Sequence, residues 1–307
     1  MAEIASMIRS FSNDTLPYNG APPEDYRPRL AIFGTSSDPP HKGHQAVVEM
    51  LVSSGDYDEV WVLPVYVHMF SSKDASLTPF DHRMAMCRLA FEGSSTSRCV
   101  VRVLPMEKLV CEAAAVANDG KPVRVGSSLI LTIVHTLYPG SVGQTTFVLG
   151  SDTFLDLASG KWKNAKNILM ENRIAVVERG MIHNGEGETT EKDDNGNSPG
   201  FDPISKAIAT CAVVDPQDLK VSRFASQGHL DVSSSLVRGL VAKLFSSSVK
   251  QAVVDVEAEG PQPEGKDEDE EDEAELRAAV HPQVLDYVFA QGLYVASNKK
   301  KEEVFDV

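Results

Sequence analysis

Short runs of apolar residues alternate along the chain with longer stretches in which apolar positions recur every three or four residues. The short runs predict buried strands over residues 30–33, 59–67, 99–104, 146–149, 173–178 and 211–215. The longer stretches predict helices from near Lys42 and over residues 79–91, 128–138, 156–170, 232–241 and 276–295. This alternation is typical of a parallel sheet with helices on both faces. We therefore expect an α/β fold with a doubly wound, mostly parallel, Rossmann-like sheet.

Two polar stretches interrupt this pattern. Residues 184–199 lack apolar side chains, and residues 255–275 hold twelve acidic residues and one lysine, which is most of the formal net charge of −15. Such stretches cannot recover the entropy lost on ordering, so we expect solvated loops inserted into a single domain over residues 29–296. Residues 1–28 are expected to form an extended lead-in and residues 297–307 a tail.

Composition narrows the classes of partner. No basic stripe accompanies the acidic total, so we expect no nucleic-acid partner. No apolar run approaches the ~18 residues that span a bilayer, so we expect no membrane partner either. The four cysteines are scattered without a CxxC pair, which favours reduced thiols over a zinc site or disulfides. The first 28 residues lack a signal-peptide core, so the expected compartment is the cytoplasm, with the nucleus as the open alternative. A homo-oligomer also stays open.

Candidate chemistry gathers where the first strand meets the first helix. The apolar run ends at Gly34, and His41 and His44 lie three apart at the helix entrance, so both project to one side of its first turn. The first-turn N–H groups lack intrahelical partners, and the helix dipole adds partial positive charge. Such a junction binds anions, and two imidazoles can stabilise charge on a phosphate. The pattern indicates an enzyme that handles nucleotides.

Other segments are expected at the same edge of the sheet. Ligands of parallel sheets bind beyond the carboxyl ends of the strands, which is where Gly34, Gly150-Ser151-Asp152 and the loop after Val67 fall. Further on, Ser233 to Ser235 offer N-cap hydroxyls to a new helix. Arg238 lies near the start of that helix, where a guanidinium suits the outer phosphates of ATP. The alternative is a plain capped amphipathic helix with a surface arginine.

The segment from Gly34 to His44, GTSSDPPHKGH, resembles the HxGH signature of nucleotidylyltransferases, in particular of the nicotinamide/nicotinate-mononucleotide adenylyltransferases. The signature is shared with cytidylyltransferases, pantetheine-phosphate adenylyltransferases and, in altered form, class I aminoacyl-tRNA synthetases. Three further blocks favour the first family. VSSSLVRGLV (232–241) looks like its ISSTxxR block, residues 147–169 resemble its Gly-x-Asp with a following tryptophan, and residues 281–294 resemble its G-L-Y ending. The resemblance implies a sheet of the nucleotidylyltransferase type.

The second block carries implied roles. By resemblance, Asp152 contacts the adenosine ribose, and Trp162 stacks on or borders a pyridine ring, for which a flat π face is a suitable partner. The alternative is that Trp162 is a packing residue. The third block is expected to be structural.

The chain also departs from the family pattern. Ser37 stands where the family has an aromatic residue, and Thr35 stands where it has a second small residue. Residues 67–83 match the lysine-containing loop of the family only loosely. Lys73 is the candidate there for a phosphate-contacting lysine, with Arg83 at the start of the next helix. The sequence does not place the residues that separate nicotinate from nicotinamide mononucleotide.

The implied reaction is adenylyl transfer from ATP to a pyridine mononucleotide, which yields a dinucleotide and pyrophosphate, as in NAD biosynthesis. His44 is assigned to the α-phosphate, His41 supports the same phosphates, and Arg238 holds the leaving pyrophosphate. The acceptor is expected to contact Ser36, Lys73 and Trp162, with the Gly34–Thr35 backbone near its phosphate. The residues expected to contact ATP are Gly34, Thr35, Gly43, Gly150, Asp152, Ser234 and Ser235. Mg²⁺ is expected to arrive with ATP, without a dedicated protein metal site.

Two alternatives stay open. The first is another HxGH transferase that uses a different phosphorylated acceptor or CTP. The second is a catalytically silent, nucleotide-binding regulatory protein in which the acidic run docks a partner.

Overall fold

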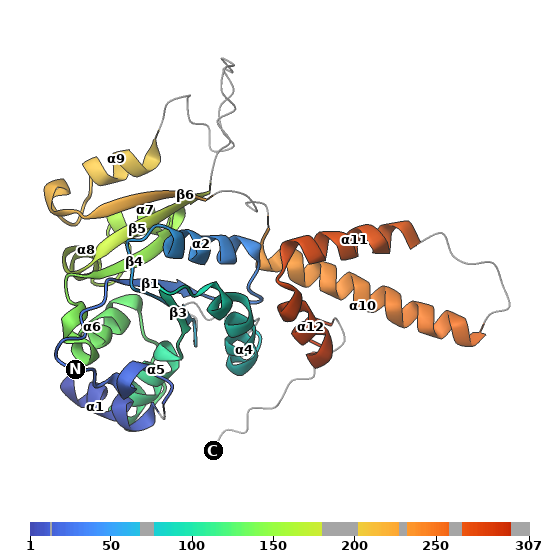
Figure 1. The fold of residues 1–307 in the computed structure, drawn as a ribbon, viewed down its shortest axis with the longest axis horizontal. Helices are drawn as coiled ribbons and strands as arrows, with labels where there is room; N and C mark the ends of the chain where they lie inside the picture. Colours follow the sequence, from blue (N-terminus) through green and yellow to red (C-terminus); the bar gives the residue numbers. More distant parts are fainter. Residues whose placement is uncertain (13, 68–76, 180–201, 227–231, 258–265, 296–307) are drawn as a thin grey trace, which may run out of the picture.

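A six-stranded, all-parallel sheet forms the centre of the computed structural model, which describes residues 1–12, 14–67, 77–179, 202–226, 232–257 and 266–295 (Figure 1). The strand order is β3-β2-β1-β4-β5-β6, so the order reverses between β1 and β4. This confirms the predicted α/β class and Rossmann-like sheet. The strands are β1 (Leu30–Thr35), β2 (Glu59–Pro64), β3 (Val100–Val103), β4 (Thr145–Gly150), β5 (Arg173–Arg179) and β6 (Val221–Ser226).

Helices cover both faces of the sheet (Figure 1). Side chains alternate along β1, where Leu30 and Ile32 face one core and Ala31 and Phe33 face the other. The first core is closed by α1 (Ala2–Phe11), α5 (Met106–Val116), α6 (Ser127–Leu137), α7 (Ser151–Ala158), α8 (Ala165–Glu171) and α9 (Pro203–Ala209). The second is closed by α2 (Lys42–Ser53), α4 (Phe80–Phe91), α10 (Ser234–Glu257), α11 (Lys266–Ala279) and α12 (Pro282–Gln291). Short 3-10 turns are η1 (Pro17–Gly20), η2 (Glu92–Ser94), η3 (Pro139–Ser141) and η4 (Pro216–Asp218).

The sequence analysis expected an extended N-terminal segment, but the structure has a helix there, α1. Ala5 and Ile8 of this helix are buried, and Ile4 and Phe11 pack beside them. These apolar positions recur at helical spacing, which gives α1 a face to bury against α5 and α6. The prediction of an extended lead-in is therefore wrong for residues 2–11, which are helical.

The acidic stretch is also more structured than predicted, because α10 runs to Glu257 and α11 begins at Lys266. The two helices lie side by side and extend from the body (Figure 1). Glu, Lys and Ala favour helix, and Glu273 pairs with Arg277 one turn on. Leu276 is buried in the second core and anchors the end of α11. The other predicted insertion, residues 184–199, lies outside the described residues, as does the tail at 297–307.

The predicted strand over residues 211–215 is wrong, because this apolar segment is a loop that packs against α7. The Ala212 N–H donates to the Ala158 carbonyl at 3.1 Å, and Val214 is buried. The last strand is instead β6, at Val221–Ser226.

Other predicted elements change their bounds or are divided. The predicted helix over 156–170 is replaced by α7 and α8, with left-handed backbone at Gly160 and Asn164 between them. The helix predicted over 276–295 breaks before Pro282, which lacks an N–H to continue it. Pro64 ends β2 earlier than predicted, and α5 occupies a stretch where the sequence predicted no element. Along the described part of the chain, no helix is long and apolar enough to cross a membrane.

A polar cluster closes the amino end of the sheet. Glu59, at the start of β2, is 8 % exposed. Its carboxylate accepts hydrogen bonds from Tyr26 Oη at 2.7 Å, Trp61 Nε1 at 2.8 Å and Arg102 Nε at 2.9 Å. Three donors compensate the burial of this charge and tie the N-terminal segment to β2 and β3.

Candidate active site

The two histidines of the first strand-to-helix turn lie together at the N-terminus of α2. His41 is the N-cap, and its Nδ1 accepts from the Gly43 N–H at 3.1 Å. His44 Nδ1 accepts in return from the His41 N–H at 3.3 Å. The ring centroids are 3.9 Å apart. Because each Nδ1 is an acceptor, each neutral ring carries its proton on Nε2, which becomes a hydrogen-bond donor.

The start of α10 is bound to the same turn. Ser234 Oγ donates to the Pro39 carbonyl at 2.9 Å. Arg238 donates from Nη1 to the Asp38 carbonyl and from Nη2 to Ser235 Oγ, the latter at 3.1 Å. Val237, Leu240 and Val241 are buried and hold the helix against the second core. The structure therefore brings Arg238 to the turn that carries both histidines, although it lies 200 residues from Asp38.

The middle of the turn is buried, at Ser37 and Asp38. Ser37 is 1 % exposed and holds a left-handed backbone with φ of 43°, which few non-glycine residues adopt. Its hydroxyl donates to Thr35 Oγ1 at 3.1 Å. Asp38 is 3 % exposed, and its carboxylate accepts from the Thr78 N–H at 3.0 Å and from Tyr294 Oη at 2.7 Å. Sequence reasoning assigned no role to Asp38.

Arg83 on α4 is a second residue whose importance the sequence did not reveal. Its side chain is 1 % exposed and lies 5.5 Å from the Phe80 ring centre. The guanidinium donates to four main-chain carbonyls, those of Ser36, Val65, Tyr66 and Thr78. Burial lowers the pKa of Arg83, and the negative charge of Asp38 partly offsets this. Arg83 thus joins the ends of β1 and β2 to the loop before α4.

The second predicted segment lies beside the first. β1 pairs with β4, and both Gly34 and Gly150 are exposed near the carboxyl ends of these strands. Gly150 is the N-cap of α7, and Asp152 is exposed in the first turn of that helix. Parallel sheets bind ligands where the strand order reverses, and this is such a point.

The remaining predicted site residues lie in the turn, on the first core or outside the described residues. Ser36 and Gly43 are half-buried in the turn, and Thr35 is buried below it. Trp162 is half-buried and packs on the first core, with its ring centre 6.4 Å from that of Phe147. Trp162 is only partly buried, so these contacts are compatible with both roles that the sequence analysis gave it. Lys73 lies outside the described residues.

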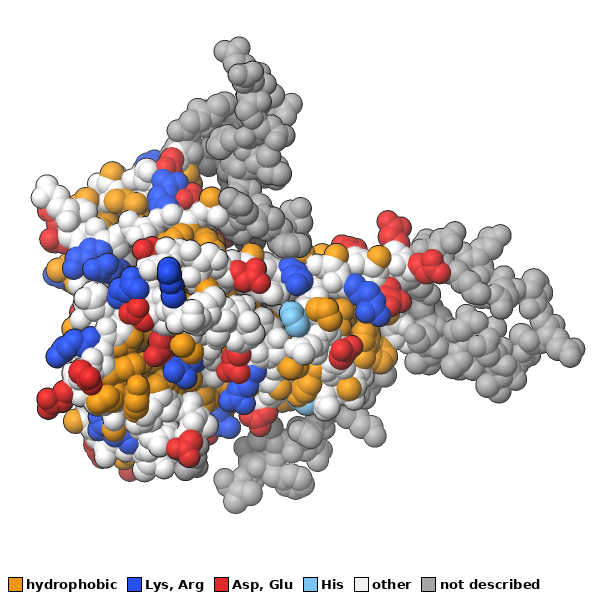
Figure 2. Space-filling view, in the orientation of Figure 1, with side chains coloured by type: hydrophobic (Ala, Val, Ile, Leu, Met, Phe, Trp, Pro, Cys, Tyr) orange, Lys and Arg blue, Asp and Glu red, His pale blue; other side chains and the backbone are white. Residues whose placement is uncertain are grey.

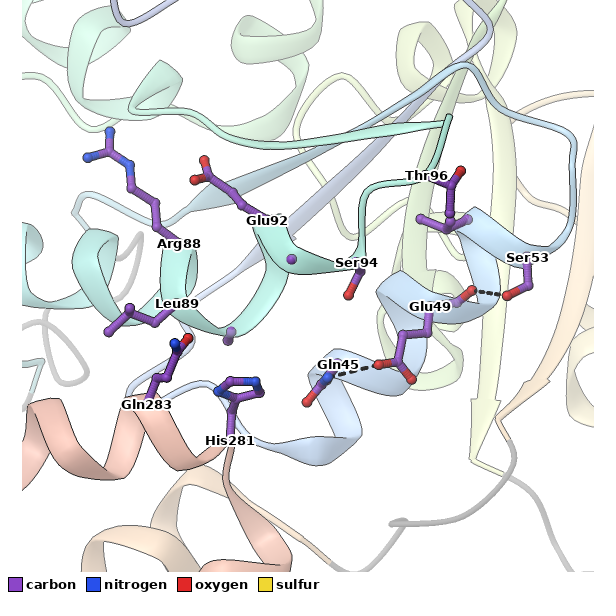
Figure 3. A pocket seen from close by; sticks show the side chains of 13 residues that line it. Gln45, Glu49, Ser53, Arg88, Leu89, Glu92, Ser94, Thr96, His281 and Gln283 are labelled. Atoms are coloured by element: carbon purple, nitrogen blue, oxygen red, sulfur yellow. Dashed lines mark hydrogen bonds between the residues drawn. The ribbon is translucent and has the colours of Figure 1, made fainter. Parts of the chain in front are cut away.

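A hollow of about 530 Å³ lies between α2, α4 and the start of α12 (Figure 3). Its wall includes Glu49, Arg88, Glu92 and His281, and none of the predicted site residues. Over the described part of the face in Figure 2, basic and acidic side chains are interspersed.

Comparison with known proteins identifies a family whose match includes the histidines and Arg238. The chain matches the Cytidylyltransferase-like family over residues 32–240. It belongs to that family. The match runs from β1 through the histidine turn to the part of α10 that holds Arg238. Membership of the cytidylyltransferase-like family confirms the prediction of a nucleotidyltransferase with a Rossmann-like sheet.

Curated relatives confirm the stated resemblance to pyridine-nucleotide adenylyltransferases. A probable nicotinate-nucleotide adenylyltransferase from Sulfurovum sp. is 45% identical over 67 residues, which are 22% of this chain and 35% of that protein. A protein of the same name from Myxococcus xanthus is 27% identical over 152 residues, 49% of this chain and 68% of that protein. The chain therefore matches about a third of the first relative and about two thirds of the second.

A solved structure shares the fold. The nicotinic acid mononucleotide adenylyltransferase of Plasmodium falciparum, complexed with APC, superposes with a TM-score of 0.52 and 18% identity. The superposition covers 86% of this chain and 96% of that one. The same enzyme complexed with NaAD gives the same values.

Proposed function

We propose that this protein transfers an adenylyl group from ATP to a pyridine mononucleotide, forming a dinucleotide and pyrophosphate in NAD biosynthesis. The observation that carries the proposal is the histidine pair, in which each Nδ1 accepts a main-chain N–H. Arg238 is hydrogen-bonded to the same turn. The names of the curated relatives and the ligands of the structural neighbours support this acceptor.

The reaction needs positioning and charge stabilisation more than covalent help from the protein. The acceptor phosphate attacks the α-phosphorus of ATP in line, and the bond to the pyrophosphate oxygen breaks. His44 Nε2–H donates to the α-phosphate as charge gathers there, and His41 supports the same phosphates. The N–H groups at the start of α2 add partial positive charge. Arg238 keeps Nη1 on the Asp38 carbonyl and directs its remaining N–H groups to the leaving pyrophosphate.

The acceptor lies at the ends of β1 and β4 in this proposal. The Gly34–Thr35 backbone and Ser36 bind its phosphate. A Cβ built on Gly34 or Gly150 would meet no atom within 4 Å, so the backbone at both strand ends is open to a ligand. Asp152 binds the adenosine ribose, Ser234 and Ser235 line the ATP side, and one edge of Trp162 borders the pyridine ring. Lys73 remains the proposed phosphate-contacting lysine.

Mg²⁺ enters bound to the triphosphate in this proposal. In the described part of the chain, no three His, Cys, Asp or Glu side chains gather as a metal site would require. The cation then neutralises phosphate charge as part of the substrate.

The direct test is His44→Ala, assayed for pyrophosphate release with ATP and nicotinate or nicotinamide mononucleotide. Loss of the α-phosphate donor is expected to lower kcat about a hundredfold or more, while the circular dichroism spectrum stays that of the folded protein. Gln45→Ala is the matched control, because Gln45 lies on the same turn of α2 and bonds to Lys42 and Glu49 side chains instead. A folded His44→Ala protein with turnover near that of the control contradicts the assignment.

The family match also favours a second candidate, transfer from CTP or to another phosphorylated acceptor. Assaying pyrophosphate release with each triphosphate and each mononucleotide decides between them. ATP binding by calorimetry with no pyrophosphate from any pair would instead indicate a silent binding protein.

A further inference from the structure

The histidine turn is held by a residue near the far end of the chain. Tyr294 lies beyond α12, 256 residues from Asp38, and its Oη donates to Asp38 Oδ1 at 2.7 Å. Asp38 Oδ2 accepts from the Thr78 N–H at 3.0 Å. Both oxygens of this buried carboxylate therefore have a donor, and each donor comes from a different segment.

Tyr294 has the properties of a fixed donor. Burial raises its pKa, and the Asp38 carboxylate raises it further, so its hydroxyl keeps the proton. Its backbone is left-handed, with φ of 65°, which costs free energy in a tyrosine. The hydrogen bond and the packing of Tyr294 on the second core offset this cost.

Asp38 links Tyr294 to the residues of the proposed reaction. Its carboxylate bonds to Tyr294, and its carbonyl accepts from Arg238. The next residue accepts from Ser234 through its carbonyl, and His41 follows two residues later. A shift of Asp38 would therefore move the Arg238 partner and the start of α2 together.

We propose that Tyr294 is a positioning residue, which acts through Asp38 to set where His41, His44 and Arg238 stand relative to one another. The inference deepens the proposed function and depends on it for its kinetic test only.

The kinetic test compares Tyr294→Phe with Tyr287→Phe. Each change removes one hydroxyl and keeps the ring. Tyr287 lies on α12 and bonds to His82 at 2.9 Å, away from the turn, so it is the matched control. We expect Tyr294→Phe to lower kcat about tenfold with little change in KM for ATP, because small displacements of reacting groups are costly. Tyr287→Phe should stay within about twofold of the unchanged protein. Equal kcat values for the two variants would overturn the inference.

A double-mutant cycle tests the path through Asp38. Asp38→Asn removes one of the two carboxylate acceptors, so it should lower kcat in the same way. If Tyr294 acts through Asp38, the combined variant loses little more than the worse single variant. Losses that multiply would show that Tyr294 acts elsewhere.

A second readout does not require turnover. The imidazole nitrogen resonances of His41 and His44, assigned with the two alanine variants, should shift in Tyr294→Phe and not in Tyr287→Phe. Unchanged signals in Tyr294→Phe would refute the inference. If the unchanged protein forms no product with any acceptor, the proposed function fails while these signals still decide the role of Tyr294.

Discussion

In the proposed function, the histidine pair has two tasks, one in folding and one in chemistry. Each Nδ1 accepts a main-chain N–H at the start of α2, which caps the helix and fixes the tautomer of the ring. The opposite nitrogen, Nε2, then carries the proton that the proposed function directs to a phosphate. A serine or aspartate would cap the helix equally well but would not present this donor. The proposed function therefore gives a chemical reason for histidine at positions 41 and 44, beyond helix capping.

Arg83 is expected to matter for stability in the same region. Replacing it with methionine fills a similar volume but leaves four carbonyls without their donor, so Arg83→Met should lower the free energy of unfolding by about 3 kcal/mol. Arg88→Met is the control, because Arg88 lies on the same helix and is exposed. Urea denaturation of both variants measures the difference, and equal midpoints would contradict the role given to Arg83.

At the scale of elements, close contacts between segments limit what each position accepts. Gly140 in η3 faces the N-terminal segment, and a Cβ there would lie 2.1 Å from the Tyr26 carbonyl oxygen. Gly239 in α10 is exposed, and a Cβ there would meet no atom within 4 Å. A side chain is thus excluded by neighbouring backbone at Gly140 and has open space at Gly239.

Alanine is expected to change stability in opposite directions at these positions. Gly140→Ala should destabilise the fold by about 1–3 kcal/mol, because the backbone of Tyr26 must move. Gly239→Ala should stabilise it by about 0.5–1 kcal/mol, because alanine favours helix. Thermal unfolding checks both, and a destabilised Gly239→Ala protein would contradict the solvent-exposed placement of this part of α10.

The sequence predicted elements well where local pattern and burial agree. The runs at β1, β4 and β5 are apolar because helices cover both faces of the sheet, so run length alone located them. The segment at 211–215 is equally apolar, but it packs as a loop on α7, a distinction that local pattern does not contain. Composition also misled over α10 and α11, because the same acidic residues suit a solvated loop and a helix.

The site was predictable to the extent that it is local. His41 and His44 lie three residues apart, so spacing alone placed them on one turn. Joining Arg238 to that turn required the family resemblance. Asp38, Arg83 and Tyr294 were missed because their roles come from burial and from partners far along the chain, and no spacing signals them.

At the scale of the whole molecule, the two ends of the sheet differ in kind. The carboxyl ends of β1 and β4 bear the exposed glycines and the histidine turn. The amino end is closed by the Glu59 cluster with Tyr26, Trp61 and Arg102. Substitutions in the Glu59 cluster are therefore expected to change stability without changing the proposed chemistry.

Glu59→Gln tests this separation. One amide oxygen cannot serve three donors, so the free energy of unfolding should fall by about 2 kcal/mol. Turnover at a temperature where the protein is folded should stay near its original value, because Glu59 lies at the opposite end of β2 from the site. Thermal unfolding and a pyrophosphate assay measure the two effects, and a large loss of turnover in the folded variant would contradict the separation.

The hydrogen bond between Asp38 and Tyr294 has a consequence for biosynthesis. Translation produces the histidine turn well before the partner of Asp38, which emerges 256 residues later. A nascent chain can build β1 and α2 early, but the turn receives its final support only after residue 294 leaves the ribosome. Completion of the turn thus requires synthesis of every strand and helix that lies between Asp38 and Tyr294.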